Sequence, residues 1–255
     1  MVGAFFEDAW RKKELPQFFK ATGVLIVAGL IGVSINLSNL YHTYEYSKET
    51  MRGKSELKYE GAAAKQTSSG LNRDYITQWS YGIGETFSLL VPNVKGGASV
   101  PLSRSEKAME KANPMYSSLY SQLTQYFGDQ PMTSGPVYVG AFVLMLFILG
   151  CFIVKGPMKW ALLGATIFSI LLSWGKNFMG LTDFFIDYIP MYNKFRAVSS
   201  ILVIAEFTIP LLAILTLKEI LTKPELLKEK LKYIYISFRL TGGLALHFAI
   251  APRLF

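Results

Sequence analysis

The sequence predicts an all-α integral membrane protein with about five transmembrane helices, a long extracytoplasmic loop and short amphipathic helices at the membrane surface. Of the 255 residues, 51% are hydrophobic and only 17% are charged, a less charged balance than that of an average soluble domain. Apolar stretches recur that are long enough to cross roughly 30 Å of hydrocarbon at about 1.5 Å per residue. Basic residues gather in short loops between these stretches. This pattern argues against disorder and against an ordinary soluble enzyme.

The first transmembrane helix is expected at residues 21–42, because Ala21 to Tyr44 contains no charged residue. About twenty mostly polar or amphipathic residues, 1–20, precede it. A cleavable signal peptide instead has a short apolar core near its start, followed by a small-residue cleavage site. We therefore expect residues 1–20 to remain as a cytoplasmic amphipathic segment.

Four further spans are expected, at residues 135–154, 160–178, 198–218 and 233–252. The second of the five ends at a basic turn. The third is short, but Lys176 can extend its ammonium group to the membrane surface and let the helix continue. The fourth carries Glu206 and Pro210, and Arg239 and His247 interrupt the fifth.

Basic residues set the expected orientation, because Lys and Arg near span ends are retained in the cytoplasm. They form three groups: Arg11, Lys12, Lys13 and Lys20; Lys155 and Lys159; and, in or beside the loop 219–232, Lys218, Lys223, Lys228, Lys230 and Lys232. With five spans, all three groups fall on one side, which puts the amino terminus in the cytoplasm and residues 43–134 outside. The net charge of +8 is then largely a topology signal, so nucleic acid is a poor candidate partner.

The external region 43–134 is expected to contain a linker and a helix. Its first part, residues 48–70, is polar with a small-residue tract, which is typical of a flexible or weakly helical linker. A helix is predicted from Asn113 to Phe127, because Asn113 can cap it, Pro114 suits its first turn and its apolar residues share one face. Such a face needs the membrane surface or the tops of the spans to cover it.

A second surface helix is expected within residues 179–197. Thr182 is its predicted cap and Pro190 its predicted end, and its aromatic residues suit the headgroup level of a membrane. Asp183 and Asp187 lie one turn apart on this helix. They are candidates for an acid and base pair or for a divalent cation site, or they compensate the helix dipole.

Two further groups of residues have candidate roles in binding. Trp79, Tyr81 and Glu85 have the composition of a sugar-stacking surface, with packing of the loop as the alternative. Lys194 and Arg196 suit a lipid phosphate or pyrophosphate, because a planar guanidinium group can donate two parallel hydrogen bonds to phosphate oxygens. The alternative is that they anchor the segment at the membrane interface.

Ionisable residues inside the predicted spans are costly and usually have a partner or a watery cavity. Glu206, expected about the middle of its helix, has either a function or a buried partner. Arg239 is that partner or extends to the cytoplasmic interface. His247 and Cys151 are interpreted as packed residues. One cysteine and two histidines supply no recognisable ligand set for zinc or an iron-sulfur cluster.

Several strings resemble the YfhO-like membrane proteins of bacteria, particularly members from Bacteroides relatives. These strings contain Leu90 to Asn93, Tyr138 to Gly140, and Pro190 to Arg196. The resemblance extends from about the first span to the fourth. It implies a multi-pass protein of the bacterial inner membrane, of the GT-C glycosyltransferase type, that moves sugar from a polyprenyl-phosphate donor to a cell-envelope acceptor.

Such enzymes usually carry their key acidic residue in the first external loop, which this chain is expected to lack as a piece of a longer polypeptide. The resemblance therefore assigns no catalytic residue. Asp183, Asp187 and Glu85 remain candidates from their chemistry alone. Two alternatives stay open: a lipid or polysaccharide transporter or flippase, for which Glu206 and Arg239 are the motivating residues, and a non-catalytic subunit of an envelope assembly.

Overall fold

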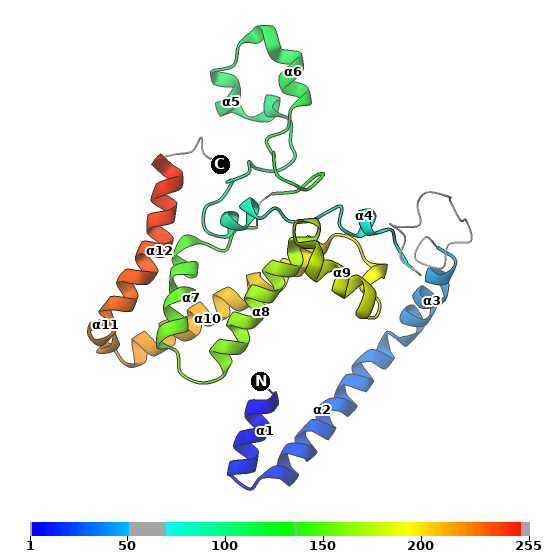
Figure 1. Ribbon diagram of the computed structural model, residues 1–255, viewed down its shortest axis with the longest axis vertical. Helices are drawn as coiled ribbons and strands as arrows, with labels where there is room; N and C mark the ends of the chain where they lie inside the picture. Colours follow the sequence, from blue (N-terminus) through cyan, green and yellow to red (C-terminus); the bar gives the residue numbers. More distant parts are fainter. Residues whose placement is uncertain (1, 51–69, 136, 251–255) are drawn as a thin grey trace. The chain divides into compact units, whose positions relative to one another are not determined.

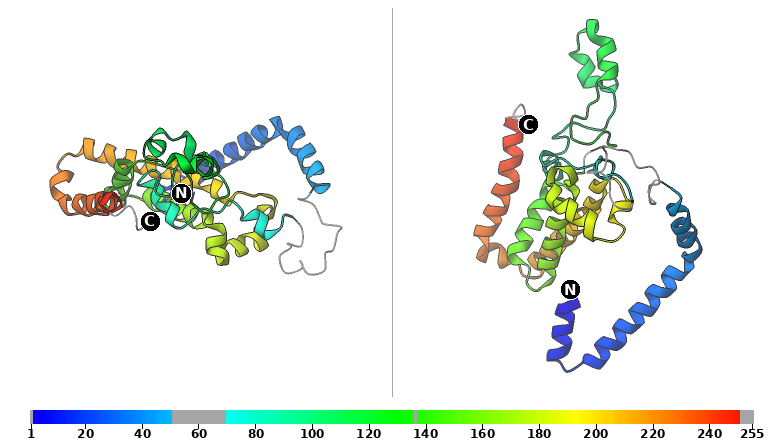
Figure 2. Two further views of the ribbon diagram at one scale, coloured as in Figure 1. Left: turned by 90° about the horizontal axis from the view of Figure 1, so that it is seen from above. Right: turned by 45° about the vertical axis from the view of Figure 1, so that its right-hand side comes forward.

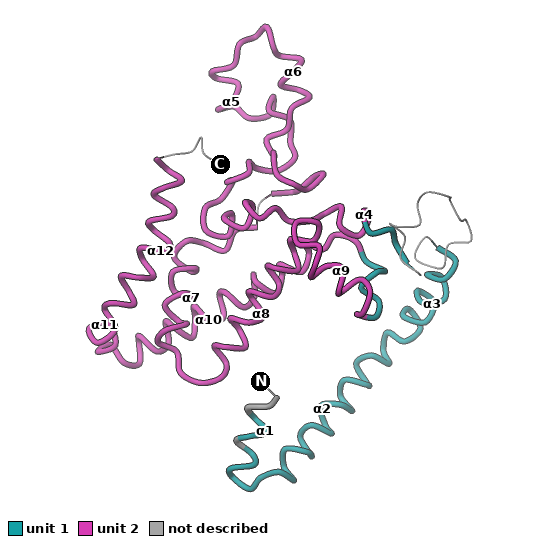
Figure 3. Tube along the Cα trace, viewed as in Figure 1, with its two compact units in different colours: residues 1–73, 190–195 teal, residues 74–189, 196–255 magenta. Residues whose placement is uncertain are grey.

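The computed structural model describes residues 2–50, 70–135 and 137–250. Their regular structure is helical (Figures 1 and 2), and within these ranges β-pairing is limited to two isolated bridges. The chain divides into two compact units (Figure 3): unit 1 comprises residues 1–73 and 190–195, and unit 2 comprises residues 74–189 and 196–255. Most of the predicted linker, at residues 51–69, lies outside the described residues. Each unit is described by itself.

Two helical stretches are long and apolar enough to cross a membrane. They are α2 (Leu15–Ile35) and the run Val198–Thr222, which joins η6 (Val198–Leu202) to α10 (Val203–Thr222). A third span results if α8 (Met158–Ser173) and the helical stretch Gly175–Tyr188 count as one broken span. The prediction of a helical membrane protein is therefore confirmed. Five spans stay a prediction, because α7 (Ala141–Ile153) is shorter than expected and α12 (Leu231–Ile250) is too polar to qualify.

Unit 1 is built from α1 (Val2–Arg11), α2 and α3 (Leu37–Lys48), with η5 (Tyr192–Lys194). Lys13 adopts a left-handed conformation with φ 59°, which ends the first helix. Phe6 packs edge-on against Phe18 across this turn, with the ring centroids 5.6 Å apart. Pro16 suits the first turn of α2, so this helix begins at Leu15, six residues before the expected start of the span.

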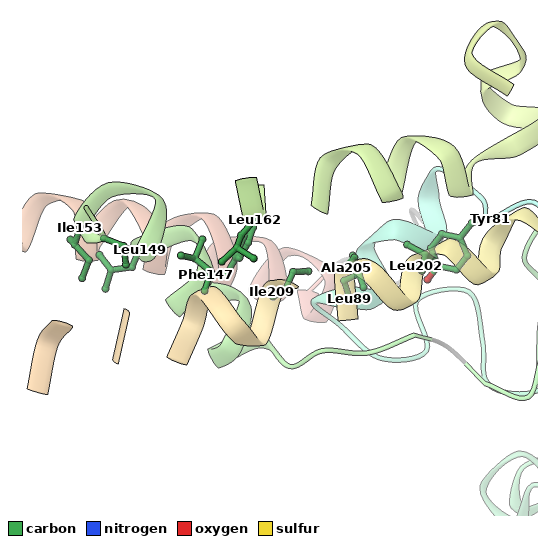
Figure 4. Close-up of a cluster of buried hydrophobic side chains, with 11 residues drawn as sticks. Tyr81, Leu89, Phe147, Leu149, Ile153, Leu162, Leu202, Ala205 and Ile209 are labelled. Atoms are coloured by element: carbon green, nitrogen blue, oxygen red, sulfur yellow. The ribbon is translucent and has the colours of Figure 1, made fainter. Parts of the chain in front are cut away.

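The helices of unit 2 pack around one hydrophobic cluster (Figure 4). Both α10 and α12 pack against α7, and α10 also packs against α8; α11 (Leu226–Glu229) joins α10 to α12. The backbones of α7 and α10 come close at Gly150, where an added Cβ would lie 2.2 Å from Thr216 Oγ1. Between α8 and α10, the buried hydroxyls of Thr166 and Thr208 are hydrogen-bonded at 2.6 Å. Small and hydroxyl-bearing residues at helix contacts are typical of membrane bundles.

The expected third span does not run straight to residue 178. After Ser173 the chain turns at Gly175, whose φ of +44° favours glycine, and passes through η4 (Gly175–Phe178) into α9 (Met179–Tyr188). The two helical stretches are bent by 108°. The prediction that Thr182 caps a helix is wrong. It lies inside α9, fully buried, and its hydroxyl donates to the carbonyl of Gly175 at 2.9 Å, which holds the bend.

Residues 74–135 and 137–140 form the long loop region that precedes α7. Its short helices are α4 (Arg73–Ile76), η1 (Gly84–Leu89), η2 (Leu102–Arg104), α5 (Glu106–Glu110), η3 (Pro114–Tyr116) and α6 (Ser117–Gln122). Asn113 caps as predicted, because its Oδ1 accepts a hydrogen bond from the Met115 amide at 3.0 Å. The helix nevertheless ends at Gln122 and does not reach Phe127.

Backbone pairing ends that helix early and creates a narrow neck. The amide of Leu102 donates to the carbonyl of Leu123 at 2.8 Å, and the amide of Phe127 donates to the carbonyl of Lys95 at 3.0 Å. At Gly96, with φ +81°, an added Cβ would lie 1.8 Å from the carbonyl oxygen of Gln125. The neck, at residues 95–100 and 125–133, carries an arm formed by residues 101–124, which contains α5 and α6 (Figure 1).

Substituting Gly150→Ala is expected to lower the free energy of unfolding by about 1–3 kcal/mol, because the new methyl group overpacks the contact with the buried Thr216. Gly164→Ala in α8 is the matched control, since nothing lies within 4 Å of its added Cβ. Thermal unfolding of the purified protein in detergent measures both. Equal midpoints for the two variants would contradict the close α7–α10 approach.

Candidate functional site

A strip of the loop region, residues 79–88, is hydrogen-bonded to the ends of the apolar helices. The amide of Tyr81 donates to the carbonyl of Ser173 at 2.8 Å, and the indole of Trp174 donates to Thr86 Oγ1 at 2.9 Å. Gly175 permits this approach, because a Cβ there would lie 2.2 Å from Ser80 Oγ. The strip is therefore fixed on the end of α8, and the candidate site is built on it.

The carboxylate of Glu85 is the buried charge of this site, with 4% of the residue exposed. Its Oε2 accepts a hydrogen bond from the Gly82 amide at 2.6 Å, and its Oε1 accepts a short hydrogen bond from the Tyr126 hydroxyl. Gly128 leaves room for both groups, since an added Cβ would overlap Glu85 Oε1 and Tyr126. Burial, together with the hydrogen bond to Glu85, raises the pKa of the Tyr126 hydroxyl well above its usual range.

A polar pocket of about 260 Å³ opens beside Glu85. Besides glycines and Ile83, it is lined by Glu85, Lys95, Phe127, Asp129 and Asn177. Asp129 Oδ2 accepts a hydrogen bond from the Asn177 side-chain amide at 3.1 Å. A Cβ on Gly82 would lie 2.8 Å from Asp129 Oδ2 and 3.0 Å from Glu85 Oε2, so both carboxylates approach the same glycine. The pocket thus combines two carboxylates, an amide and an ammonium group.

Arg196 lies on two aromatic rings at the other end of the strip. Its guanidinium carbon is 4.9 Å from the ring centroid of Trp79 and 5.3 Å from that of Tyr75, within cation-π range. Its Nη1 also donates to the Tyr75 hydroxyl at 2.6 Å. The side chain is nevertheless exposed. Arg196 is therefore an oriented and accessible cation, which a phosphate binder requires.

The expected sugar-stacking surface of Trp79, Tyr81 and Glu85 is not formed as one face. Tyr81 is 3% exposed and its hydroxyl is hydrogen-bonded to Ser88, so its ring packs the loop and is not open for stacking. Trp79 instead supports Arg196. Only Glu85 of the three lines the polar pocket.

Other predicted residues lie away from this pocket. Asp183 and Asp187 are one turn apart on α9 as expected, half-buried and exposed respectively, and neither lines the pocket. Within the described residues no group of three or more His, Cys, Asp or Glu side chains is placed to hold a metal ion. Lys194 belongs to unit 1, in η5.

The ionisable residues of the apolar helices are exposed and separate. Glu206 lies in the first turn of α10 and not at its middle. Arg239 and His247 are exposed on α12, and in the described part of the chain Glu206 and Arg239 form no ion pair. Cys151 is half-buried in α7, consistent with a packing role.

Sequence reasoning missed most of the pocket. Asp129, Asn177 and Lys95 come from three distant segments, and Tyr126 was not singled out within the predicted helix Asn113 to Phe127. A turn is recognisable at Gly128-Asp129, because both residue types favour turns. Nothing local indicates that this turn returns to Gly82.

Substituting Tyr126→Phe is expected to destabilise the protein by about 1–3 kcal/mol, because it leaves one oxygen of the buried Glu85 carboxylate without its hydrogen bond. Tyr116→Phe is the control, since Tyr116 is 50% exposed on the arm. Denaturant unfolding in detergent compares the two. A change no larger than that of the control would show that the hydrogen bond contributes nothing.

Alkaline pH is expected to weaken the loop region. Burial raises the pKa of Tyr81 to about 12, whereas an unfolded tyrosine titrates near about 10. Above pH of about 10 the folded state therefore binds more protons than the unfolded state, so this contribution to stability, complete below pH of about 10, is lost as pH rises toward about 12. Tyrosinate absorbance should show a late component that Tyr81→Phe makes smaller by one tyrosine, and an unchanged titration curve would contradict the burial of this ring.

Comparisons with protein-family models, with curated proteins and with solved structures found no match to this chain. The resemblance to YfhO-like proteins therefore rests on its motifs alone. In the structure Leu90 to Asn93 follows η1, Tyr138 to Gly140 precedes α7, and Pro190 to Arg196 follows α9. What this chain does has to be inferred from its own site.

Proposed function

We propose that the chain is the part of a multi-pass inner-membrane protein that binds a lipid-linked sugar on the extracytoplasmic side and takes part in sugar transfer, as in GT-C-type glycosyltransferases. The observation that carries this proposal is the polar pocket beside Glu85. It lies in the loop region, at the ends of apolar helices. That position suits a substrate whose lipid part stays in the membrane.

The lining of the pocket suits a ring that carries several hydroxyl groups. Carboxylates accept hydrogen bonds from hydroxyls, an ammonium group donates them, and an amide does both. The volume of about 260 Å³ is slightly below the roughly 300–1,000 Å³ of pockets for drug-sized ligands, which favours one small polar ring. Phe127, which is 62% exposed, offers a flat apolar face at the edge of this pocket.

Arg196 supplies the second half of the proposed recognition. Trp79, on which it lies, precedes Gly82 of the pocket by three residues, so the two backbone positions are at most about 11 Å apart at 3.3–3.6 Å per residue. A sugar and the phosphate attached to it are neighbouring groups of one ligand. The oriented guanidinium group therefore suits the phosphate while the pocket holds the sugar.

The two carboxylates have different environments and hence different proposed roles. Both oxygens of Glu85 already accept hydrogen bonds, so Glu85 shapes the pocket and orients a ligand. Asp129 is exposed, and its Oδ2 accepts a hydrogen bond from the side-chain amide of Asn177. Asp129 is thus the carboxylate better placed to accept a proton from an acceptor hydroxyl, as a general base does.

Substituting Asp129→Asn is expected to slow sugar transfer by about 10²–10⁴-fold, the usual effect of losing a general base.

Arg196→Ala is expected to weaken binding of the donor, with partial rescue by Arg196→Lys, which keeps the charge. Transfer from a synthetic polyprenyl-phosphate-linked hexose is measured with the intact protein in proteoliposomes.

The matched controls are Glu110→Gln and Arg104→Ala, exposed charges on the arm and in η2 at its base. Both are expected to behave as the unsubstituted protein does. Undiminished transfer and donor binding in Asp129→Asn and Arg196→Ala would reject the proposed function.

A transporter or flippase is the second candidate, and the observation that favours it is the exposed carboxylate of Glu206 on a helix that qualifies as a span. An ionisable group on such a surface usually marks a partner or a pathway. In this case Glu206→Gln abolishes translocation of a fluorescent lipid across vesicles, whereas Asp129→Asn leaves it intact. The opposite result favours sugar transfer.

A further inference from the structure

The two basic loops of unit 2 come together at one end of its helices. The connection from α7 to α8 carries Lys155 and Lys159, and the connection from α10 to α12 carries five lysines: Lys218, Lys223, Lys228, Lys230 and Lys232. Both connections lie at the same end of unit 2 (Figure 1). There the ring of Phe152 in α7 stacks on that of Tyr233 in α12, with the centroids 4.8 Å apart. We call residues 152–160 and 218–235 the basic end.

The positive charge of the basic end is not neutralised by pairing within the described chain. Its seven lysines outnumber its three glutamates, which are Glu219, Glu225 and Glu229. Among the described residues none of these ten side chains forms an ion pair. The lysines are therefore available to an anion from outside the protein.

Lys159 is held in a fixed position at this end. Its Nζ donates a hydrogen bond to the carbonyl of Cys151 at 3.0 Å, close to the carboxyl end of α7. The same Nζ lies 5.2 Å from the ring centroid of Trp160, within cation-π range. An ammonium group has three N–H donors, so the carbonyl leaves two of them for another acceptor.

A second ammonium group is joined to the first through the aromatic pair. Lys230 Nζ lies 5.9 Å from the ring centroid of Tyr233, which stacks on Phe152, the residue after Cys151. Lys159 and Lys230 are both half-buried, whereas the other five lysines are exposed. Two oriented cations thus lie on one aromatic cluster, surrounded by mobile ones.

A membrane surface is expected at the same place. The candidate span Val198–Thr222 ends within the basic end, so Lys223 is the first residue beyond this span. Trp160 and Tyr235 are both exposed there, and these residue types are enriched at the headgroup level of membranes. Headgroup phosphates are therefore the anions that these lysines meet first.

We propose that the basic end binds the phosphate groups of anionic phospholipids, with Lys159 and Lys230 as its two oriented contacts. A phosphodiester accepts hydrogen bonds from ammonium groups, and an anionic lipid, unlike a zwitterionic one, brings no cation of its own. Exposed apolar side chains beside the lysines, such as Trp160 and Leu221, suit the acyl chains. The remaining lysines attract the anionic surface without a fixed geometry.

Native mass spectrometry of the full chain in detergent micelles, with added phosphatidylglycerol, measures this binding. Lys159→Gln and Lys230→Gln are each expected to lower the affinity about fivefold, and the double variant about 25-fold, the usual contribution of a basic residue near an anionic lipid. Lys159→Arg keeps the affinity, because a guanidinium group also donates to phosphate. The matched controls, Lys107→Gln and Lys111→Gln, remove the same charge from exposed positions on the arm and leave the affinity unchanged.

A second measurement separates lipid binding from folding. In nanodiscs of phosphatidylcholine the double variant should unfold at the temperature of the unsubstituted protein, because neither lysine belongs to the hydrophobic cluster of unit 2. Adding phosphatidylglycerol to the nanodiscs should raise the unfolding temperature of the unsubstituted protein more than that of the double variant. This difference should shrink at high salt, which screens the charges.

Three outcomes overturn the proposal: an affinity for phosphatidylglycerol that the double variant retains, an equal loss of affinity in the arm variants, or an equal affinity for phosphatidylcholine. Glycerol phosphate without acyl chains is the last comparison. Stabilisation by it as large as that by phosphatidylglycerol would assign the lysines to a soluble anion and overturn the lipid proposal too. None of these readouts depends on sugar transfer, so they are separate from the test of the proposed function.

Discussion

The buried carboxylate of Glu85 is the constraint on which the loop region depends. A charge removed from water must be hydrogen-bonded, and Glu85 obtains its partners from Gly82 nearby and from Tyr126, forty-one residues further along the chain. This requirement brings the return segment of the loop back onto the strip that caps α8. Gly128 is needed there because any side chain would displace the carboxylate. The neighbouring pocket is a consequence of this closure, since Asp129 follows Gly128 directly.

The apolar helices supply a rigid base for this closure. Membrane helices gain little from hydrophobic burial against one another, so close packing and hydroxyl pairs decide how they associate. Gly150 against Thr216 and Thr166 against Thr208 are such contacts. The bend at Gly175 then turns the chain across the end of α8 and exposes the groups to which the strip binds. Site and bundle are thus connected through hydrogen bonds of both backbone and side-chain groups.

Residue patterns predicted the helical membrane class, an apolar helix before residue 43 and the cap at Asn113, because these depend on local composition and on hydrogen bonds within a few residues. The bounds of that helix differ, since it is Leu15–Ile35 and not residues 21–42. The same patterns misplaced Thr182 as a cap, because a buried hydroxyl that holds a bend has the same local sequence as a cap. They extended the helix after Asn113 too far, because pairing with residues 100–102 competes with helix formation. Asp129 and Asn177 were missed entirely, since their proximity is a product of chain closure over long separations.

The narrow neck at Gly96 and Gln125 makes the arm a separable module. Its backbone hydrogen bonds close a small base, so the length and surface of residues 101–124 have no bearing on the geometry around Glu85. An insertion or exchange in the arm changes the surface that the protein presents to other molecules. It leaves the geometry of the pocket beside Glu85 intact. Proteins that share this base are therefore expected to diverge first in the arm, and a reporter domain for imaging or purification is best inserted there.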